Sequence, residues 1–212
     1  HNSDRRQRQM CIRDRACLVA LISNFGSNIS IIEPLFFTGF EISNASIIFS
    51  QVSDKNLFIE EWWRLITPIF IHFSLTHLVF NCLWIYILGQ KIEVIDGKSI
   101  FILICLFSAI FGNLMHFYFS GVSIFGGLSG VVYGLLGFCF SQELMESRNK
   151  YLLPPALYLF MLIWLCLGFT GLLDLLGFGK IANFAHLGGL IGGFTVSLSL
   201  IHISEPTRRT PI

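Results

Sequence analysis

Long apolar runs separated by polar segments recur along the chain and predict an all-α fold. A membrane-spanning helix needs about 20 mostly apolar residues, and charge-free runs of that order are present. The first run, from Ala16, is too short to span and is interpreted as a truncated helix. The pattern predicts a polytopic membrane helix bundle of six transmembrane helices, near Ala16–Phe25, Leu75–Gln90, Ser99–Phe119, Ser129–Phe140, Tyr151–Leu173 and Ala182–His202.

Composition supports a membrane protein. The 212 residues are 54% hydrophobic and 13% charged, whereas a soluble domain carries about 25% charged residues. No polar stretch is long enough to build its own core, so one membrane domain is expected over residues 16–202. The ends, "RRQRQMCIRDR" and "ISEPTRRTPI", do not continue the membrane pattern. Residues 1–15 are therefore expected to be a non-native or disordered segment, and 203–212 a non-native tail.

Basic residues predict the orientation, since Lys and Arg concentrate in cytoplasmic loops. The long connector Gly26–Pro68 carries apolar patches such as "IIEPLFF" and is expected at the membrane interface. The side of the membrane that holds this connector carries few basic residues. Both termini are therefore placed in the cytoplasm, and the protein is placed in the inner membrane of a bacterium. The basic residues are Lys91, Lys98, Arg148 and Lys150 on the cytoplasmic side, against Lys55, Arg64 and Lys180 outside.

Two classes of partner find no support in the residues. A net charge of +1 gives no reason to expect nucleic-acid binding, and the six cysteines include no CxxC pair. Free structural thiols are the simpler interpretation, and no metal site is expected.

Polar residues inside membrane helices are costly, so their positions are informative. In "HFSLTHLVFN", Ser74 is a candidate N-cap, which leaves His72 just outside the helix and His77 in its first turn. Asn81 follows His77 by four residues and lies on the same helix face.

A serine heads the fourth apolar run, "FGGLSGVVYGLLGF". A helix from Ser129 to Phe140 would be about 18 Å long, against a hydrocarbon core of about 30 Å. We therefore expect Ser129 below the outer surface, at the floor of a wet cavity.

Glycines predict where this serine lies. Gly189 and Gly193 share a face with His186, and the serine's own helix has a stripe of small residues, Gly130, Gly134, Gly137 and Ser141. Two such faces let helices approach closely, which would bring His186 beside Ser129. Glycine stripes are usually plain packing, and a lone histidine is often structural. The segment also lacks the G-x-S-x-G pattern, because position 131 is Val. Convergence of Ser, two His and Asn at one depth favours a catalytic site.

These residues resemble those of a rhomboid intramembrane serine protease, of the bacterial GlpG type. "WWR" at 62–64 is similar to the family's Trp-Arg motif, and His72, His77 and Asn81 match HxxxxHxxxN. The further matches are Gly89, Glu93 and Gly97 after helix two, Gly127–Gly130 as GxSG, and Ala185, His186, Gly189 and Gly193 as AHxxGxxxG.

The resemblance implies a Ser129–His186 catalytic dyad. The oxyanion would be bound by His77, Asn81 and the backbone N–H of Ser129. Substrates would be single-pass or multi-pass membrane proteins, cleaved within the lipid bilayer near the outer face, with no cofactor, metal or nucleic acid. The resemblance also implies that helix five is a lateral gate. The supporting residues are Tyr133, Gly127, Gly130, Gly189, Gly193, His72 and Arg64.

Two other functions compete with the protease. A catalytically inactive rhomboid-like protein would bind membrane clients, but the presence of both Ser129 and His186 argues against it. A small transporter would explain polar residues within the membrane. It is disfavoured because the sequence shows no internal repeat and no charged residues along a pathway.

Overall fold

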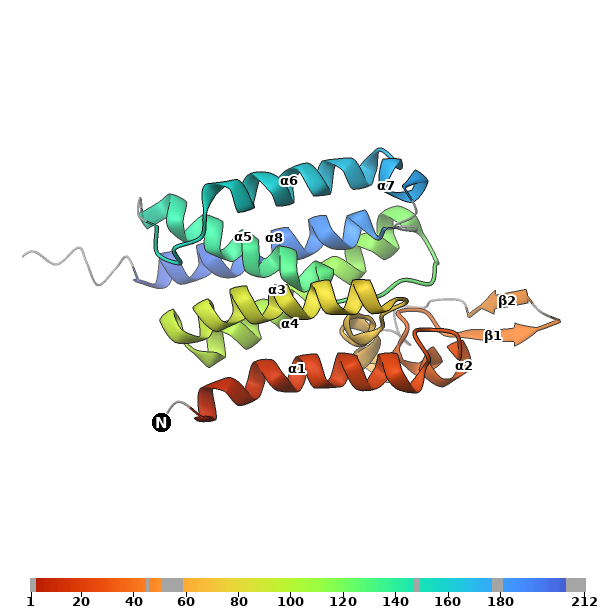
Figure 1. The fold of residues 1–212 in the computed structure, drawn as a ribbon. Coiled ribbons are helices and arrows are strands. Elements are labelled where there is room, and N and C mark those ends of the chain that lie inside the picture. The colour runs from red at the N-terminus through yellow and green to blue at the C-terminus, as the bar shows by residue number, and fades with distance from the viewer. Residues whose placement is uncertain (1–2, 45, 51–58, 147–148, 177–180, 205–212) are drawn as a thin grey trace, which may run out of the picture.

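Long helices run side by side in the computed structural model, and a small hairpin projects from one end (Figure 1). The structure describes residues 3–44, 46–50, 59–146, 149–176 and 181–204. The tail from residue 205 lies outside these ranges, as do Lys55, Arg148 and Lys180. The longer helices are α1 (Ser3–Ile22), α3 (Leu75–Ile95), α4 (Lys98–Ser120), α5 (Ser129–Glu146), α6 (Pro155–Phe169) and α8 (Asn183–Ser204).

Three of the described helices, α3, α4 and α8, are long and apolar enough to cross a membrane. Helix α6 is apolar but shorter, at 15 residues. The count of six spans therefore stays a prediction.

The connector between α1 and α3 is structured, and part of it is not helical. It contains a short helix α2 (Ile29–Ile32), 3-10 turns η1 (Glu33–Leu35), η3 (Trp62–Leu65) and η4 (Thr67–Phe70), and the antiparallel strands β1 (Phe40–Ser43) and β2 (Ser46–Phe49). The all-α prediction missed this hairpin. Phe40 lies opposite Phe49 in the ladder, and their rings are 6.1 Å apart, a cross-strand aromatic pair that stabilises the two strands.

Two predicted helix ends differ from the structure, and the second of them affects the predicted position of Ser129. Helix α1 begins at Ser3 rather than Ala16, because Arg, Gln and Met in this stretch favour helix. Helix α5 ends at Glu146 rather than Phe140 and has 18 residues, which makes it about 27 Å long. The prediction that Ser129 lies deep because its helix is short is therefore wrong in its premise.

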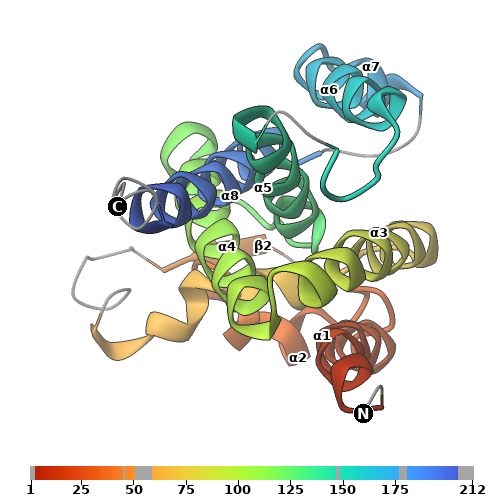
Figure 2. The same ribbon diagram turned by 90° about the vertical axis from the view of Figure 1, so that its left-hand side faces the viewer.

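The predicted helix Tyr151–Leu173 is also divided. Pro154 and Pro155 keep the preceding residues out of the helical region, so α6 begins at Pro155. It ends at Phe169, because Gly171 has a left-handed backbone with φ +75°, and a short helix α7 (Leu172–Leu175) follows. Figure 2 shows α6 and α7 set apart from the group formed by α4, α5 and α8.

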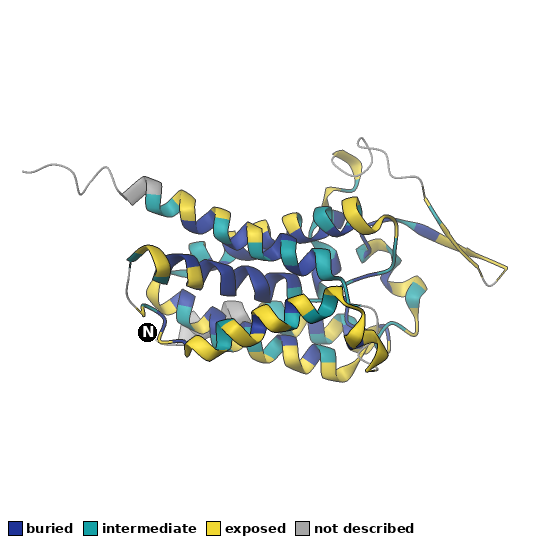
Figure 3. Ribbon diagram, turned by 90° about the horizontal axis from the view of Figure 1, so that it is seen from above, coloured by how far each residue is buried: buried dark blue, intermediate teal, exposed yellow. Residues whose placement is uncertain are grey.

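Burial is concentrated where α4, α5 and α8 meet. Every residue of α5 from Gly130 to Cys139 is buried. In α6 the only buried residues are Met161 and Leu165. Figure 3 shows buried residues at the contacts between helices and exposed residues on their outer faces. Many of the exposed residues are large and apolar, as expected for a bundle surrounded by lipid.

Candidate active site

Ser129 and His186 are in direct hydrogen-bond contact. The Ser129 Oγ atom lies 2.7 Å from Nε2 of His186. Ser129 is the first residue of α5, and His186 lies in the first turn of α8. Two helices that begin at the same end of the bundle thus hold a hydroxyl and an imidazole together. Such a pair can activate a serine oxygen as a nucleophile.

Glycines explain why these two helices approach so closely. A Cβ atom on Gly189 would overlap the backbone of Gly130, and one on Gly193 would overlap that of Gly134. A Cβ on Gly130 would lie 3.1 Å from the carbonyl oxygen of Ala185, the residue before His186. The predicted contact between the two small-residue faces is confirmed, and it brings His186 to Ser129.

A second glycine pair on α8 contacts α4, which sequence reasoning did not foresee. A Cβ on Gly188 would lie 2.5 Å from the carbonyl oxygen of Phe111, and one on Gly192 would lie 3.0 Å from that of Phe107. The run "GGLIGG" therefore presents two small faces, one to α5 and one to α4. Helix α8 is held against two neighbours, so its rotation, and with it the direction of His186, is constrained.

Tyr133 lies one turn below Ser129 and stacks on the His186 ring. The ring centroids are 4.9 Å apart and the planes differ by 25°. The Tyr133 hydroxyl donates to the carbonyl of Met161 in α6, 2.9 Å away. Nδ1 of His186 is buried and has no hydrogen-bond partner among the described residues. The imidazole is thus oriented by stacking and by Ser129, and no carboxylate of the described residues bonds to it.

His72 holds Asn81 in place beside the dyad. Its Nδ1–H donates to the Phe70 carbonyl at 3.2 Å, since a carbonyl can only accept. In the neutral ring Nε2 is then an acceptor, and it receives the Asn81 amide at 3.2 Å and the Leu128 N–H at 3.4 Å. Burial, followed by the neighbouring His77, lowers the pKa of His72 to about 3. The ring therefore stays neutral at physiological pH, and Asn81 keeps its second amide hydrogen free.

His77 and Asn81 both lie next to Gly127. Ser74 caps α3, and its side chain accepts the His77 N–H at 3.2 Å, as predicted. A Cβ on Gly127 would lie 2.7 Å from Cε1 of His77 and 3.7 Å from the Asn81 amide nitrogen. Gly127 also has a φ of +126°, a backbone conformation that disfavours other residues. Glycine thus leaves room beside Ser129, and these two side chains face that room.

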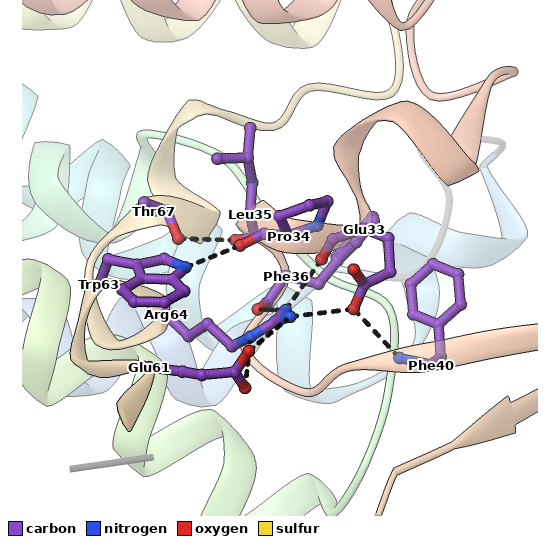
Figure 4. A network of polar contacts seen from close by, with 9 residues as sticks. All are labelled: Glu33, Pro34, Leu35, Phe36, Phe40, Glu61, Trp63, Arg64 and Thr67. Atoms are coloured by element: carbon purple, nitrogen blue, oxygen red, sulfur yellow. Dashed lines mark hydrogen bonds and ion pairs between the residues drawn. The ribbon is translucent and has the colours of Figure 1, made fainter. Parts of the chain in front are cut away.

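Arg64 organises the connector away from the dyad (Figure 4). Its side chain is 6% exposed and its Nη1 donates to the carbonyls of Glu33 and Phe36, both at 2.9 Å. Its Nη2 and Nε form ion pairs with Glu33 and Glu61, each at 3.0 Å. Because the two glutamates compensate its charge, a buried guanidinium is tolerated here. Arg64 ties together segments that lie 31 residues apart.

The organised connector also contacts the segment that precedes Ser129. The Gly127 N–H donates to the Pro68 carbonyl at 3.0 Å. From the other side, the Asn113 amide of α4 donates to the Leu65 carbonyl at 2.8 Å. The site is therefore assembled from α3, α5 and α8, with the connector fixing the entry to α5. Arg64 is a distant support, because its hydrogen bonds within the described part of the chain go to Glu33, Phe36 and Glu61 and none goes to Ser129 or His186.

Sequence reasoning missed two polar residues of α4 that line a small cavity with Ser129. The cavity measures about 10 Å³, and its wall includes Ser108, Asn113 and Gly130. A space of this size holds about one water molecule. Ser108 Oγ is buried and has no hydrogen-bond partner among the described residues. The signal was available, because polar residues inside an apolar helix are costly unless they have a partner.

Comparison with known proteins agrees with these motifs. The model of the Rhomboid domain matches residues 59–203. The chain is 38% identical over 135 residues to the "Rhomboid protease GlpG" of Serratia proteamaculans, and equally to those of Yersinia pseudotuberculosis and Yersinia pestis. In each case the match covers 64% of this chain and 47% of the relative. The chain thus spans about half the length of the curated relatives it matches.

Proposed function

This chain belongs to the rhomboid family, and from that premise we propose that it is an intramembrane serine endopeptidase with a Ser129–His186 dyad. The observation that carries the proposal is the 2.7 Å contact between Ser129 Oγ and His186 Nε2. The relatives from Serratia and Yersinia reported above are named rhomboid proteases, which supports the same activity. Substrates are transmembrane segments of other membrane proteins.

The reaction runs in two stages. Ser129 Oγ attacks the carbonyl carbon of the scissile peptide while His186 Nε2 takes the hydroxyl proton. When the tetrahedral intermediate collapses, His186 returns that proton to the leaving amine and an acyl-enzyme remains. Water then attacks the ester carbonyl, again losing its proton to His186. When this second intermediate collapses, the bond between the carbonyl carbon and Ser129 Oγ breaks, His186 passes the proton to Oγ, and the new carboxyl end is released.

Charge that develops on the carbonyl oxygen needs donors in place beforehand. The backbone N–H of Ser129 lies at the start of α5, where helix N–H groups are unpaired and the helix dipole favours an anion. His77 and Asn81 add side-chain donors from α3. In this proposal His72 positions Asn81, Tyr133 positions His186, and Gly127 gives the substrate carbonyl access. Gly130, Gly189 and Gly193 set the approach of α5 and α8.

The proposed activity is tested by labelling the purified chain with a fluorophosphonate and by incubating it with a transmembrane substrate that carries glycine or alanine near one membrane boundary. Such residues weaken the helix and expose the peptide bond. We expect covalent labelling and a single cleavage in the substrate. Client binding without labelling would favour an inactive rhomboid-like protein, and solute flux without labelling would favour a transporter.

Asn81→Ala is expected to slow cleavage without abolishing labelling. It removes one oxyanion donor, which lowers turnover by about 10²–10³-fold in serine proteases. The Ser129–His186 contact lies on other helices and should persist. The measurement is the cleavage rate beside the fluorophosphonate labelling rate, with Asn28→Ala, at an exposed asparagine whose side chain makes no cap hydrogen bond, as the matched control. Unchanged turnover in Asn81→Ala would remove Asn81 from the oxyanion site and leave the dyad in place.

We also propose that both termini face the cytoplasm of a bacterial cell with an inner membrane, so that cleavage occurs near the outer face. Lys91, Lys98 and Lys150 support this orientation through the positive-inside rule. A cysteine introduced at Ser120 in intact cells should react with an impermeant thiol reagent above the background of the parent chain. One at Asn149 should not react. The reverse pattern would invert the orientation and the side of cleavage.

A further inference from the structure

An amphipathic groove lies between α5 and α6 at the end of the bundle opposite the dyad. Its volume is about 370 Å³, and Phe140, Leu144 and Leu153 form its apolar wall. Glu143, Asn149 and Tyr158 form its polar part. Glu143 belongs to the helix that starts at Ser129, and at ~1.5 Å per residue it lies about 21 Å farther along the axis. The groove is therefore separate from the candidate active site.

The Glu143 carboxylate is held in a defined orientation. Its Oε1 atom accepts the Tyr151 N–H and its Oε2 atom accepts the Tyr158 hydroxyl, both at 2.8 Å. A carboxylate offers about four acceptor positions. Two neutral donors fix this one and leave acceptor capacity on the side of the groove.

Glu143 has no cationic partner among the described residues. Two lysines that bond to neighbouring residues, Lys150 and Lys91, have other partners. Lys150 pairs with Asp96 at 2.8 Å and with Glu146 at 3.4 Å, and Lys91 donates to the Tyr151 carbonyl at 2.8 Å. A partly buried carboxylate that has no counter-ion among the described residues favours binding of a cation.

We propose that this groove binds one aminophospholipid, with its primary ammonium on Glu143 and an acyl chain along Phe140, Leu144 and Leu153. The groove lies at one end of a bundle whose helices α3, α4 and α8 are long and apolar enough to cross a bilayer, and the ends of such helices lie at the depth of the lipid headgroups. An ammonium supplies three N–H donors, and the exposed Asn149 amide can donate to the lipid phosphate. A lipid with a net negative headgroup and no ammonium would leave Glu143 without a cationic partner, and the carboxylate would repel that headgroup.

Bound lipid would join the ends of α5 and α6. Helix α6 contributes only Met161 and Leu165 to the buried core, so its apolar contact with the bundle is small. A ligand that contacts Glu143 of α5 and the wall near Tyr158 of α6 adds to that contact. Because it binds the folded state alone, it should raise the unfolding temperature.

The test titrates phosphatidylethanolamine into the purified chain in detergent, with phosphatidylcholine of the same acyl chains in parallel. Native mass spectrometry counts bound lipid, and thermal unfolding reports stabilisation. We expect one bound lipid. The ethanolamine lipid should bind about tenfold more tightly than the choline lipid, because a charge-assisted hydrogen bond contributes about that much to affinity. Mono- and dimethylated headgroups should fall between the two, because each methyl group removes one N–H donor.

Glu143→Gln should remove most of the headgroup preference. Its amide oxygen can still accept the Tyr151 N–H, and its NH2 group can donate to the Tyr158 hydroxyl oxygen, so both neighbours keep a hydrogen-bond partner. Glu41→Gln, an exposed carboxylate of β1, is the matched control and should keep it. Equal binding of all headgroups by the unmodified chain would overturn the proposal, as would a preference that survives in a folded Glu143→Gln variant. Equal stabilisation by soluble phosphoethanolamine would overturn a lipid as the occupant. If Glu143→Gln does not fold, the methylation series decides alone.

Discussion

Ser129→Ala is expected to abolish both cleavage of a membrane substrate and labelling by a fluorophosphonate. The methyl group that remains has no oxygen to attack a carbonyl or phosphorus atom. Loss of the nucleophile from a serine protease dyad or triad costs about 10⁶-fold in turnover. The fold should survive, because Ser129 Oγ contacts only His186 among the described hydrogen bonds. Product formation and covalent labelling are followed together.

His186→Ala should lose nearly as much, because without the base the Ser129 hydroxyl keeps its proton. Ser99→Ala, an exposed serine at the other end of the bundle, is the matched control and should behave as the parent. Wild-type cleavage by Ser129→Ala would refute the protease proposal. Labelling of His186→Ala at the parent rate would refute the base while leaving the nucleophile.

Gly189→Ala is expected to have the largest effect on stability. Its new Cβ would overlap the backbone of Gly130, and backbone cannot rotate away as a side chain can. The two helices must separate, and overpacking of this kind costs about 1–3 kcal/mol, occasionally more. For a chain of this size, ~3 kcal/mol corresponds to a fall of about 6–12 °C in unfolding temperature.

Activity should fall along with stability, since the same contact brings His186 to Ser129. Thr195→Ala, an exposed position on α8, is the control and should shift the unfolding temperature by no more than a degree or two, about what an exposed substitution costs. The measurement is thermal unfolding in detergent beside the cleavage rate. An unfolding temperature equal to that of the parent would contradict the close approach of α5 and α8.

The sequence by itself determined the parts of the site that depend on local spacing. Ser74 three residues before His77 predicted the cap on α3, which is present. Glycines at 189 and 193 in phase with His186 predicted the contact with α5, which the structure contains. These inferences succeed because a helix repeats every 3.6 residues, so spacing in sequence converts directly into a face in space.

The predictions that failed concern where helices end. The apolar pattern predicts a helix that ends at Phe140, yet α5 continues through Ser141 and Gln142 to Glu146. The side chains of Ser141 and Gln142 are satisfied by Ser197 of α8, with Oγ–Oγ and Nε2–Oγ distances of 2.9 and 3.0 Å. A polar residue can stay within a membrane helix when a neighbouring helix supplies a hydrogen-bond partner, and whether it does depends on tertiary packing.

Only the tertiary structure decided which distant groups meet. It alone revealed that Gly188 and Gly192 contact α4, that the Tyr133 hydroxyl donates to Met161 of α6, and that His72 holds Asn81. Arg64 and Glu33, 31 residues apart, form an ion pair for the same reason. Such pairings depend on how the helices and the connector pack, and a buried polar group takes whichever partner that packing brings within reach. Local periodicity carries no information about that choice.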